Sequence, residues 1–308
     1  MKKENELNVK PVNLFDKGVL VDLSMGRWGA RKKLKASDID KKENEIPEIF
    51  SLGQKWKVEK GNFKVFSIIA YSADAIIKRY SIPFPIKGIV FVPNSFLTPL
   101  LKELKELKAK YEEEADVFSS ATYKEAIERI KRKFPKQWEG MRTEYPSAEE
   151  VRSKFYFDYQ VFKLSMPDTN AMSKEAIADQ KAAFKNKVDE FVDMYSKTIK
   201  QEIAAMTANL AERFLKGGTF KQNSIDNILD LCDRFENGLN LFDDRELTES
   251  IQSMKRMFTK NKSAEAIRND EKLMSKLGKE LRAMTKAVEG KIETVSEDLK
   301  TFKRKLTL

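Results

Sequence analysis

The chain has 308 residues, of which 34% are charged and 41% hydrophobic, and it carries a formal net charge of +10. It contains no histidine and one cysteine, Cys232, which excludes an intramolecular disulfide, a histidine-based catalytic triad and a cysteine-based zinc site. The low cysteine content predicts a reducing compartment, and we expect a cytoplasmic protein. The basic balance favours an acidic partner such as nucleic acid.

No apolar run reaches the length of about 18 residues that a membrane-spanning helix needs. The charged start, MKKENELNVK, lacks the apolar stretch of a signal peptide. We therefore expect no membrane partner.

The first half of the chain mixes strand and helix signals. Residues 18–25 (GVLVDLSM) alternate in part and predict a strand, with an amphipathic helix as the alternative. Apolar residues at helical spacing over 63–80 predict a helix that ends before Pro83. Residues 86–93 (IKGIVFVP) predict a second strand, and the two strands are expected to pair into a small ribbon packed against helices.

Helical signals dominate from residue 98 onward. Thr98, which precedes Pro99, is expected to cap a helix, and Ser120 is expected to cap the next one. Ser147 and Glu150 have the spacing of a capping box, in which each side chain binds a free backbone amide of the first turn.

Two long apolar stripes mark the second half of the chain. The first runs from about Ala171 to Gly217-Gly218 and steps by threes and fours. The second runs from Met274 to Leu306, and its alternating steps of three and four are typical of a coiled-coil seam. Between them, two shorter helices are predicted near residues 223–237 and 244–259.

These elements predict a mainly α fold, built as a long antiparallel helical hairpin or coiled-coil bundle with a small β-ribbon near the N-terminal half. We expect two domains. Residues 1–165 would form a mixed, mostly helical domain with the ribbon, and residues 166–308 would form the long helical bundle.

Catalytic signatures are missing from the sequence. It has no G-x-x-x-x-G-K-[ST] phosphate loop and no G-x-S-x-G motif. Asp230, Asp233 and Asp244 are expected on solvated faces, Asp243 is expected to cap a helix, and Cys232 is expected to be a small buried hydrophobe. We therefore predict that the protein is not an enzyme and has no cofactor or bound metal. The alternative, a metal-dependent nuclease, requires three or more converging carboxylates.

The stretch MGRWGARKKLK, residues 25–35, places two glycines and a tryptophan among basic residues without an acid. A G-x-x-G pattern lets the backbone approach a phosphate, basic side chains neutralise phosphates, and an aromatic ring can stack on a base. The alternative is a tight turn with the indole in the core and the lysines as the first exposed turn of a helix. The residues predicted to bind nucleic acid here are Arg27, Trp28, Arg31, Lys32, Lys33 and Lys35.

A second basic run, ERIKRKFPKQW, covers residues 128–138, and a third covers residues 300–305. Each run alone is typical of a solvated helix face, and a nucleic-acid footprint requires them to converge on one side. The aromatic run at 154–162 (KFYFDYQVF) is either a stacking platform or core, and the core is favoured. The second run adds Arg129, Lys131, Arg132 and Lys133 to the predicted nucleic-acid-binding residues.

Three motifs resemble those of an uncharacterised family of proteins from phages, plasmids and other mobile elements. They are Trp28–Leu34 (WGARKKL), Arg79–Phe84 (RYSIPF) and Tyr145–Phe155 (YPSAEEVRSKF), and together they span the first half of the chain. Ala30 stands where the pattern has a glycine or another small residue. Members are often encoded near MoxR-type AAA+ ATPases and von Willebrand A-type proteins, which implies an accessory role and no known active site.

The sequence and the resemblance together predict a non-enzymatic accessory protein of a phage or mobile element that serves replication, recombination or packaging. It would bind the phosphate backbone through basic faces, largely without sequence preference. The alternative is a coiled-coil scaffold or adaptor that self-assembles into a homo-oligomer or engages an AAA+ ATPase, with the charge keeping long helices in solution.

Overall fold

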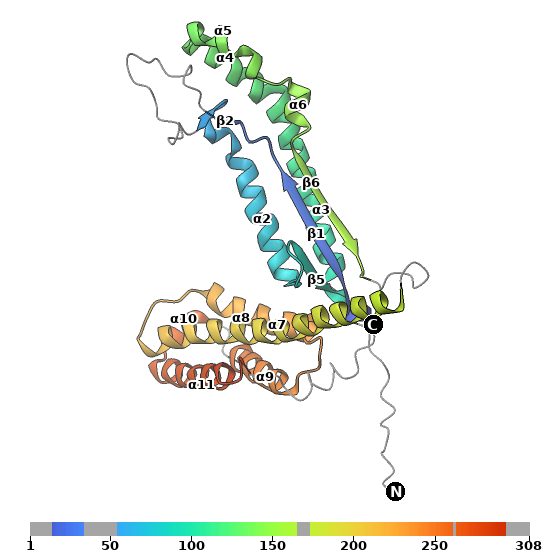
Figure 1. The fold of residues 1–308 in the computed structure, drawn as a ribbon. Coiled ribbons are helices and arrows are strands. Elements are labelled where there is room, and N and C mark those ends of the chain that lie inside the picture. The colour runs from blue at the N-terminus through green and yellow to red at the C-terminus, as the bar shows by residue number, and fades with distance from the viewer. Residues whose placement is uncertain (1–13, 34–53, 165–172, 261–262, 294–308) are drawn as a thin grey trace, which may run out of the picture. The chain divides into compact units, whose positions relative to one another are not determined.

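The structure is a computed structural model that describes residues 14–33, 54–164, 173–260 and 263–293 (Figure 1). It divides into two compact units that alternate along the chain. Unit 1 contains residues 1–21, 80–98 and 161–308, and unit 2 contains residues 22–79 and 99–160. The domain boundary expected near residue 165 lies outside the described residues.

The sheet has four strands in the order β4–β5–β1–β6. β4 pairs antiparallel with β5, with Ile82 opposite Phe91. The strand prediction for residues 18–25 is therefore confirmed and its helical alternative is wrong. The sheet is larger than the expected two-stranded ribbon, because β4 and the aromatic strand β6 add to it. The strands are β1 (Gly18–Gly26), β4 (Ile82–Pro83), β5 (Ile89–Pro93) and β6 (Tyr156–Phe162).

The helices of unit 1 centre on α7, the long helix that the first apolar stripe predicted. It has 42 residues, which corresponds to about 63 Å at the helical rise. The Ser173 hydroxyl caps its first turn by accepting from the Ala176 amide at 3.2 Å. At the other end, Gly217 adopts a φ of 66° and the Gly218 amide donates to the Arg213 carbonyl at 2.8 Å, which ends the helix. The unit's helices are α1 (Leu14–Lys17), α7 (Lys174–Leu215), α8 (Gln222–Arg234), α9 (Arg245–Lys260), α10 (Ala264–Arg268) and α11 (Glu271–Glu289).

α11 packs antiparallel along α7, as the hairpin prediction required. A β-carbon at Gly278 would lie 2.9 Å from the Leu215 side chain, so a residue early in α11 faces the end of α7. Further along α11, the Thr285 hydroxyl donates to the Thr207 hydroxyl at 2.9 Å inside the interface. The partners therefore run in opposite directions along the two helices.

The second apolar stripe is helical over a shorter span than predicted. α11 ends at Glu289, and Gly290 forms the cap, its amide donating to the Lys286 carbonyl at 3.0 Å. The continuous helix expected from Met274 to Leu306 is therefore wrong at this point, because beyond Gly290 the Lys291 amide donates to the Val288 carbonyl at 3.0 Å, three residues back instead of four. Residues 294–308 lie outside the described residues.

The cap of α9 also differs from the prediction by one residue. The Asp244 carboxylate, which is buried, accepts from the Leu247 amide at 3.2 Å. Asp243 is exposed and has a φ of 52°, so the chain passes through a left-handed conformation there before the helix begins. The expectations that Asp243 caps this helix and that Asp244 lies on a solvated face are therefore both wrong.

Unit 2 contains the second half of β1, residues 22–26, and the helices packed beside it. α2 confirms the helix predicted before Pro83. α3 begins at Asn94, so Pro99 lies inside it and the predicted Thr98 cap is wrong. The elements are β2 (Arg31–Lys33), β3 (Gln54–Trp56), η2 (Lys60–Phe63), α2 (Lys64–Tyr80), α3 (Asn94–Val117, of which 94–98 belong to unit 1), η3 (Phe118–Thr122), α4 (Tyr123–Lys133), α5 (Pro135–Met141), η4 (Arg142–Glu144) and α6 (Ala148–Arg152).

The chain passes from α3 to α4 without a break, through the π-helical turn η3. Ser120 sits in this turn, and its hydroxyl donates to the Asp116 carbonyl at 2.6 Å, so the predicted Ser120 cap is wrong. The capping box at α6 is confirmed. The Glu150 amide donates to the Ser147 hydroxyl at 3.1 Å, and the Ser147 amide donates to the Glu150 carboxylate at 2.7 Å.

Aromatic rings fill the core of unit 2. The ring centroid of Phe66 lies 4.7 Å from that of Phe155, 5.3 Å from Tyr111 and 5.9 Å from Phe118. Phe155 and Phe157 are buried, so the core interpretation of the aromatic run at 154–162 is confirmed for these two rings. The alternating burial of β6 leaves other members of the run exposed.

The close contact of β1 with β5 gives the first prediction. A β-carbon at Gly18 would overlap the Val92 carbonyl oxygen and the Phe91 ring. We expect Gly18→Ala to lower the free energy of unfolding by about 2 kcal/mol, measured by urea denaturation. Gly61→Ala is the matched control, since a β-carbon at Gly61 has nothing within 4 Å, and it should change stability by less than about 0.5 kcal/mol. Equal stabilities of the two variants would contradict the contact.

Candidate nucleic-acid interface

The basic stretch forms a turn between β1 and the β2–β3 hairpin. β2 pairs antiparallel with β3, with Arg31 opposite Trp56. Ala30 is buried and adopts a φ of 47°, and its carbonyl accepts from the Lys57 amide at 2.7 Å. This left-handed conformation explains why a glycine or another small residue suits this position.

Gly26 ends β1 at a point where two tyrosines approach its backbone. The Tyr111 hydroxyl donates to the Gly26 carbonyl at 2.6 Å. A β-carbon at Gly26 would overlap the Tyr156 ring. Burial raises the pKa of Tyr111 to about 12, so its hydroxyl remains a donor at neutral pH. The first glycine of the G-x-x-G pattern therefore has a packing role.

Trp28 is half-buried among aromatic rings. Its ring centroid lies 5.2 Å from that of Tyr123, in an edge-on arrangement, and 6.5 Å from those of Phe63 and Phe118. The Tyr123 hydroxyl in turn donates to the Pro146 carbonyl at 2.7 Å. This packing favours the alternative interpretation of the indole, which holds the turn in place. The helix that the same alternative expected after the turn is wrong, because residues 31–33 form β2.

Arg27 is exposed at the start of the turn. Its Nη1 donates to the Ser67 hydroxyl at 3.0 Å and to the Phe63 carbonyl at 3.3 Å, and its guanidinium carbon lies 5.5 Å from the centre of the Phe63 ring. Among the described residues, no acidic side chain pairs with Arg27. Its remaining N–H groups are therefore available to an anion.

The first two basic runs each form an ion pair with a neighbouring segment, and the elements that carry them, β2 and α4, lie at one end of unit 2 (Figure 1). Arg129 Nη1 in α4 lies 3.0 Å from Glu59 Oε2. Lys32 Nζ in β2 lies 2.8 Å from Glu144 Oε1, and the Lys57 ammonium donates to the Glu144 carbonyl. The structure thus brings together the runs at 27–33 and 128–133. Lys35 and the third run, at 300–305, lie outside the described residues.

The predicted residues differ in how far their charge is neutralised. Lys32, Arg129 and Lys131 pair with acidic side chains, the last with Glu128. Arg31 is exposed beside them. Within the described ranges, the predicted residues that pair with no acidic side chain are Arg27, Lys33, Arg132 and Lys133.

Sequence reasoning missed a third basic segment that lies beside these two. Residues 54–64 (QKWKVEKGNFK) contain four lysines and one acid, Glu59. Lys60 and Lys64 are exposed, and neither pairs with an acidic side chain in the described part of the chain. The excess of lysine over acid was a usable signal. We call the basic end of unit 2 the set Arg27, Arg31, Lys33, Lys60, Lys64, Arg132 and Lys133.

A small cleft lies at the basic end between α4 and the segment before η2. Its volume is about 230 Å³. Arg129, which is paired with Glu59, and Lys133 line it together with Phe134, which is 48% exposed, so Lys133 is the cation there without an acidic partner among the described residues. Cationic and aromatic groups side by side suit a phosphate and an adjoining apolar ring.

Other chemistry has little support in the described residues. Cys232 is buried, its thiol lies 3.8 Å from the Ile251 carbonyl, and burial raises its pKa to about 12. This confirms the prediction of a small buried hydrophobe. No group of three or more acidic or cysteine side chains is placed to hold a metal in the residues that the structure describes. None of the described helices is long and apolar enough to cross a membrane.

The fold and the site together define a mainly α-helical protein with a small sheet and an exposed basic end packed on aromatic rings. Residues 15–278 match a family described as a protein of unknown function, DUF3150. The match covers most of the chain, and the chain belongs to this family. No match was found among the curated proteins or the solved structures.

Cys232 provides a direct test of burial in unit 1. A thiol with a pKa of about 12 is thiolate to only about one part in 10,000 near pH 8, and its sulfur is enclosed. We expect a thiol-specific dye to react with the native protein far more slowly than with the protein in guanidinium, measured by absorbance. Cys232→Ser serves as the blank. Rapid stoichiometric labelling of the native protein would contradict the burial.

The role of Trp28 is tested by its removal. Because three rings contact the indole, we expect Trp28→Ala to lower the free energy of unfolding by about 2–4 kcal/mol. Trp28→Phe should restore roughly half of the loss. Both are measured by thermal or urea unfolding. An alanine variant as stable as the parent would contradict the packing role of the indole.

Proposed function

We propose that the chain is a non-enzymatic nucleic-acid-binding protein whose basic end contacts the phosphate backbone. The observation that carries the proposal is the convergence of three basic segments, 27–33, 54–64 and 128–133, at one end of unit 2. Several of their cations are exposed and pair with no acidic side chain in the described residues. Such cations displace counterions from a nucleic acid, and this release drives binding.

The binding is expected to be largely independent of sequence. The cations at the basic end are suited to phosphates, which carry no direct sequence information. About five phosphate contacts would give a slope near −4 to −5 in a plot of the logarithm of affinity against the logarithm of salt concentration.

We place this protein, on its resemblance, in a phage or other mobile element, as an accessory factor in replication, recombination or packaging. A cytoplasmic location in the bacterial host would follow from that role. No cofactor is required for phosphate contacts of this kind.

A second candidate function is a scaffold or adaptor. The antiparallel packing of α11 on α7 gives unit 1 the helical character of such proteins, and the resemblance links the family to genes for AAA+ ATPases. In this case the protein would form a homo-oligomer or bind the ATPase, and nucleic acid would have no effect on either.

The test is a charge reversal at the basic end. We expect Lys33→Glu combined with Lys133→Glu to weaken binding to labelled DNA or RNA by tenfold or more near 0.1 M salt, and to reduce the salt slope by about 2. Fluorescence anisotropy across a salt series measures both quantities for the full chain.

The matched control is Lys102→Glu combined with Lys105→Glu. These lysines are exposed on α3 in the same unit, so the net charge changes equally. The control should alter affinity by no more than about threefold. If no nucleic acid binds at low salt, or if both pairs weaken binding equally, a phosphate interface at the basic end is ruled out.

A further inference from the structure

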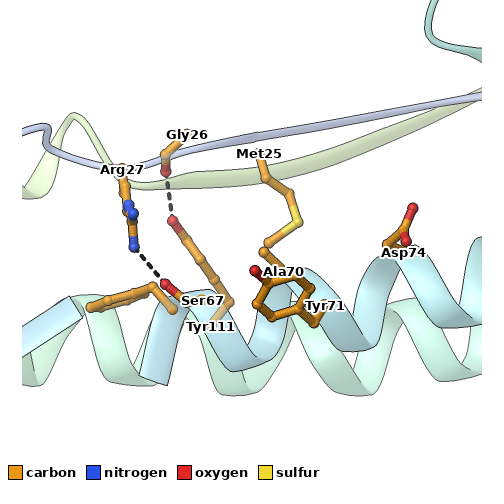
Figure 2. A pocket seen from close by; sticks show the side chains of 9 residues that line it. Met25, Gly26, Arg27, Ser67, Ala70, Tyr71, Asp74 and Tyr111 are labelled. Carbon is orange, nitrogen blue, oxygen red and sulfur yellow. Dashed lines mark hydrogen bonds between the residues drawn. The ribbon is translucent and has the colours of Figure 1, made fainter. Parts of the chain in front are cut away.

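A groove of about 450 Å³ opens in unit 2 next to Arg27 (Figure 2). This volume lies within the range of roughly 300–1,000 Å³ that is usual for ligand sites. It runs between the end of β1 and one side of α2, with α3 behind. Its lining residues are Met25, Gly26, Arg27, Phe66, Ser67, Ala70, Tyr71, Asp74 and Tyr111.

The middle of the groove is apolar and aromatic. Met25 reaches from β1 toward α2, and Ala70 lies below it (Figure 2). Tyr71 stands at the rim with 77% of its surface exposed, although it is a large aromatic residue. A ring that is this exposed beside an apolar recess is available to stack on a flat ligand.

The two ends of the groove carry opposite charges. Arg27 lies at one end, with N–H groups that no described acidic side chain uses, and Asp74 lies at the other (Figure 2). Asp74 Oδ2 lies 2.6 Å from Lys78 Nζ one turn further along α2, so its charge is partly balanced. An anionic group of the ligand is therefore expected beside Arg27, which belongs to both the groove and the basic end of unit 2.

We propose that this groove binds an unstacked base of a single-stranded nucleic acid, with the base on Tyr71 and the neighbouring phosphate on Arg27. The inference rests on the proposed function, because it extends the phosphate track of the basic end into the groove. The inference narrows the ligand from nucleic acid in general to a single strand with an unstacked base. A base in a duplex is paired and stacked and cannot enter a recess, whereas a single strand presents its bases freely.

A peptide is a poorer fit to the same observations. The cationic neighbours of Arg27 at the basic end complement a polyanion, and an apolar peptide would gain nothing from them. The flat ring of Tyr71, exposed on one helix face, suits the face of a base without selecting its identity.

The experiment compares a single strand with a duplex. The probes are a fluorescein-labelled oligothymidine of about 20 nucleotides and a blunt duplex of the same length. They are longer than the roughly 4–16 nucleotides that one OB-fold domain covers on a single strand. Anisotropy is measured with the full chain, Tyr71→Ala, Tyr71→Phe and Ile68→Ala. Ile68 is the matched control, since it is 53% exposed on the same helix but does not line the groove.

We expect Tyr71→Ala to weaken binding of the single strand about tenfold and to leave duplex binding within about twofold. Tyr71→Phe should retain most of the affinity because it keeps the ring, and Ile68→Ala should match the parent. The alanine variant is expected to fold, because the side chain that it removes is exposed; its unfolding midpoint checks this.

Two results would overturn the inference, and only one of them would also overturn the proposed function. If Tyr71→Ala does not affect the single strand, or weakens strand and duplex equally, the groove is not a base site, while a charge-reversal effect at Lys33 and Lys133 would keep the proposed function. If neither probe binds at low salt, the proposed function and this inference fail together.

Discussion

The stacking of aromatic rings inside unit 2 determines where its charged residues stand. Phe118 is central, because its ring centroid lies 5.1 Å from Phe63, 5.2 Å from Phe155 and 6.5 Å from Trp28. These rings come from four separate parts of the chain. Aromatic side chains bury a large area and have few rotamers, so they fix the segments that carry them with little freedom. Arg27 next to Trp28, Lys64 next to Phe63 and Lys154 next to Phe155 are held in place as a result.

The ion pairs at the basic end contribute position more than stability. The pairs formed by Arg129 with Glu59 and by Lys32 with Glu144 lie at or near the surface, where a pair contributes only about 0–1 kcal/mol. The first joins α4 to the segment before η2, and the second joins β2 to η4. A surface of this kind keeps some cations occupied by the protein itself and leaves others, such as Lys33 and Lys133, for a ligand.

Local sequence patterns predicted the helices whose apolar repeat continues over many turns. They failed where contacts between residues far apart in the chain set the ends of an element. α7 was predictable because its apolar residues repeat over many turns. Thr98 and Ser120 have the chemistry of caps, yet α3 begins earlier and continues through η3. Capping residues are also common on exposed positions inside helices. α11 ends where the backbone changes to three-residue hydrogen bonds at Lys291 and Ile292, and the regular apolar pattern does not signal this change.

The candidate site was predictable in part for the same reason. The runs at 27–33 and 128–133 are dense in basic residues and were found. Residues 54–64 were missed because Glu59, Trp56 and Phe63 dilute their lysines. The convergence of the three segments depends on the β2–β3 pairing and on ion pairs between residues far apart in the chain. The groove beside Arg27 is lined by residues from β1, α2 and α3, and no local sequence pattern indicates that these three elements come together.

The alternation of the two units along the chain limits how the protein can be dissected. A fragment that stops near residue 165 keeps all the segments of unit 2, but it also carries β4 and β5 without the α7 residue that packs on them. The complementary fragment would expose Phe191, whose ring packs 5.2 Å from Phe84 and 5.0 Å from Phe91. Truncation near residue 165 therefore exposes apolar surface on both fragments and favours aggregation. A soluble form of unit 2 requires a redesigned chain that joins residues 22–79 directly to residues 99–160.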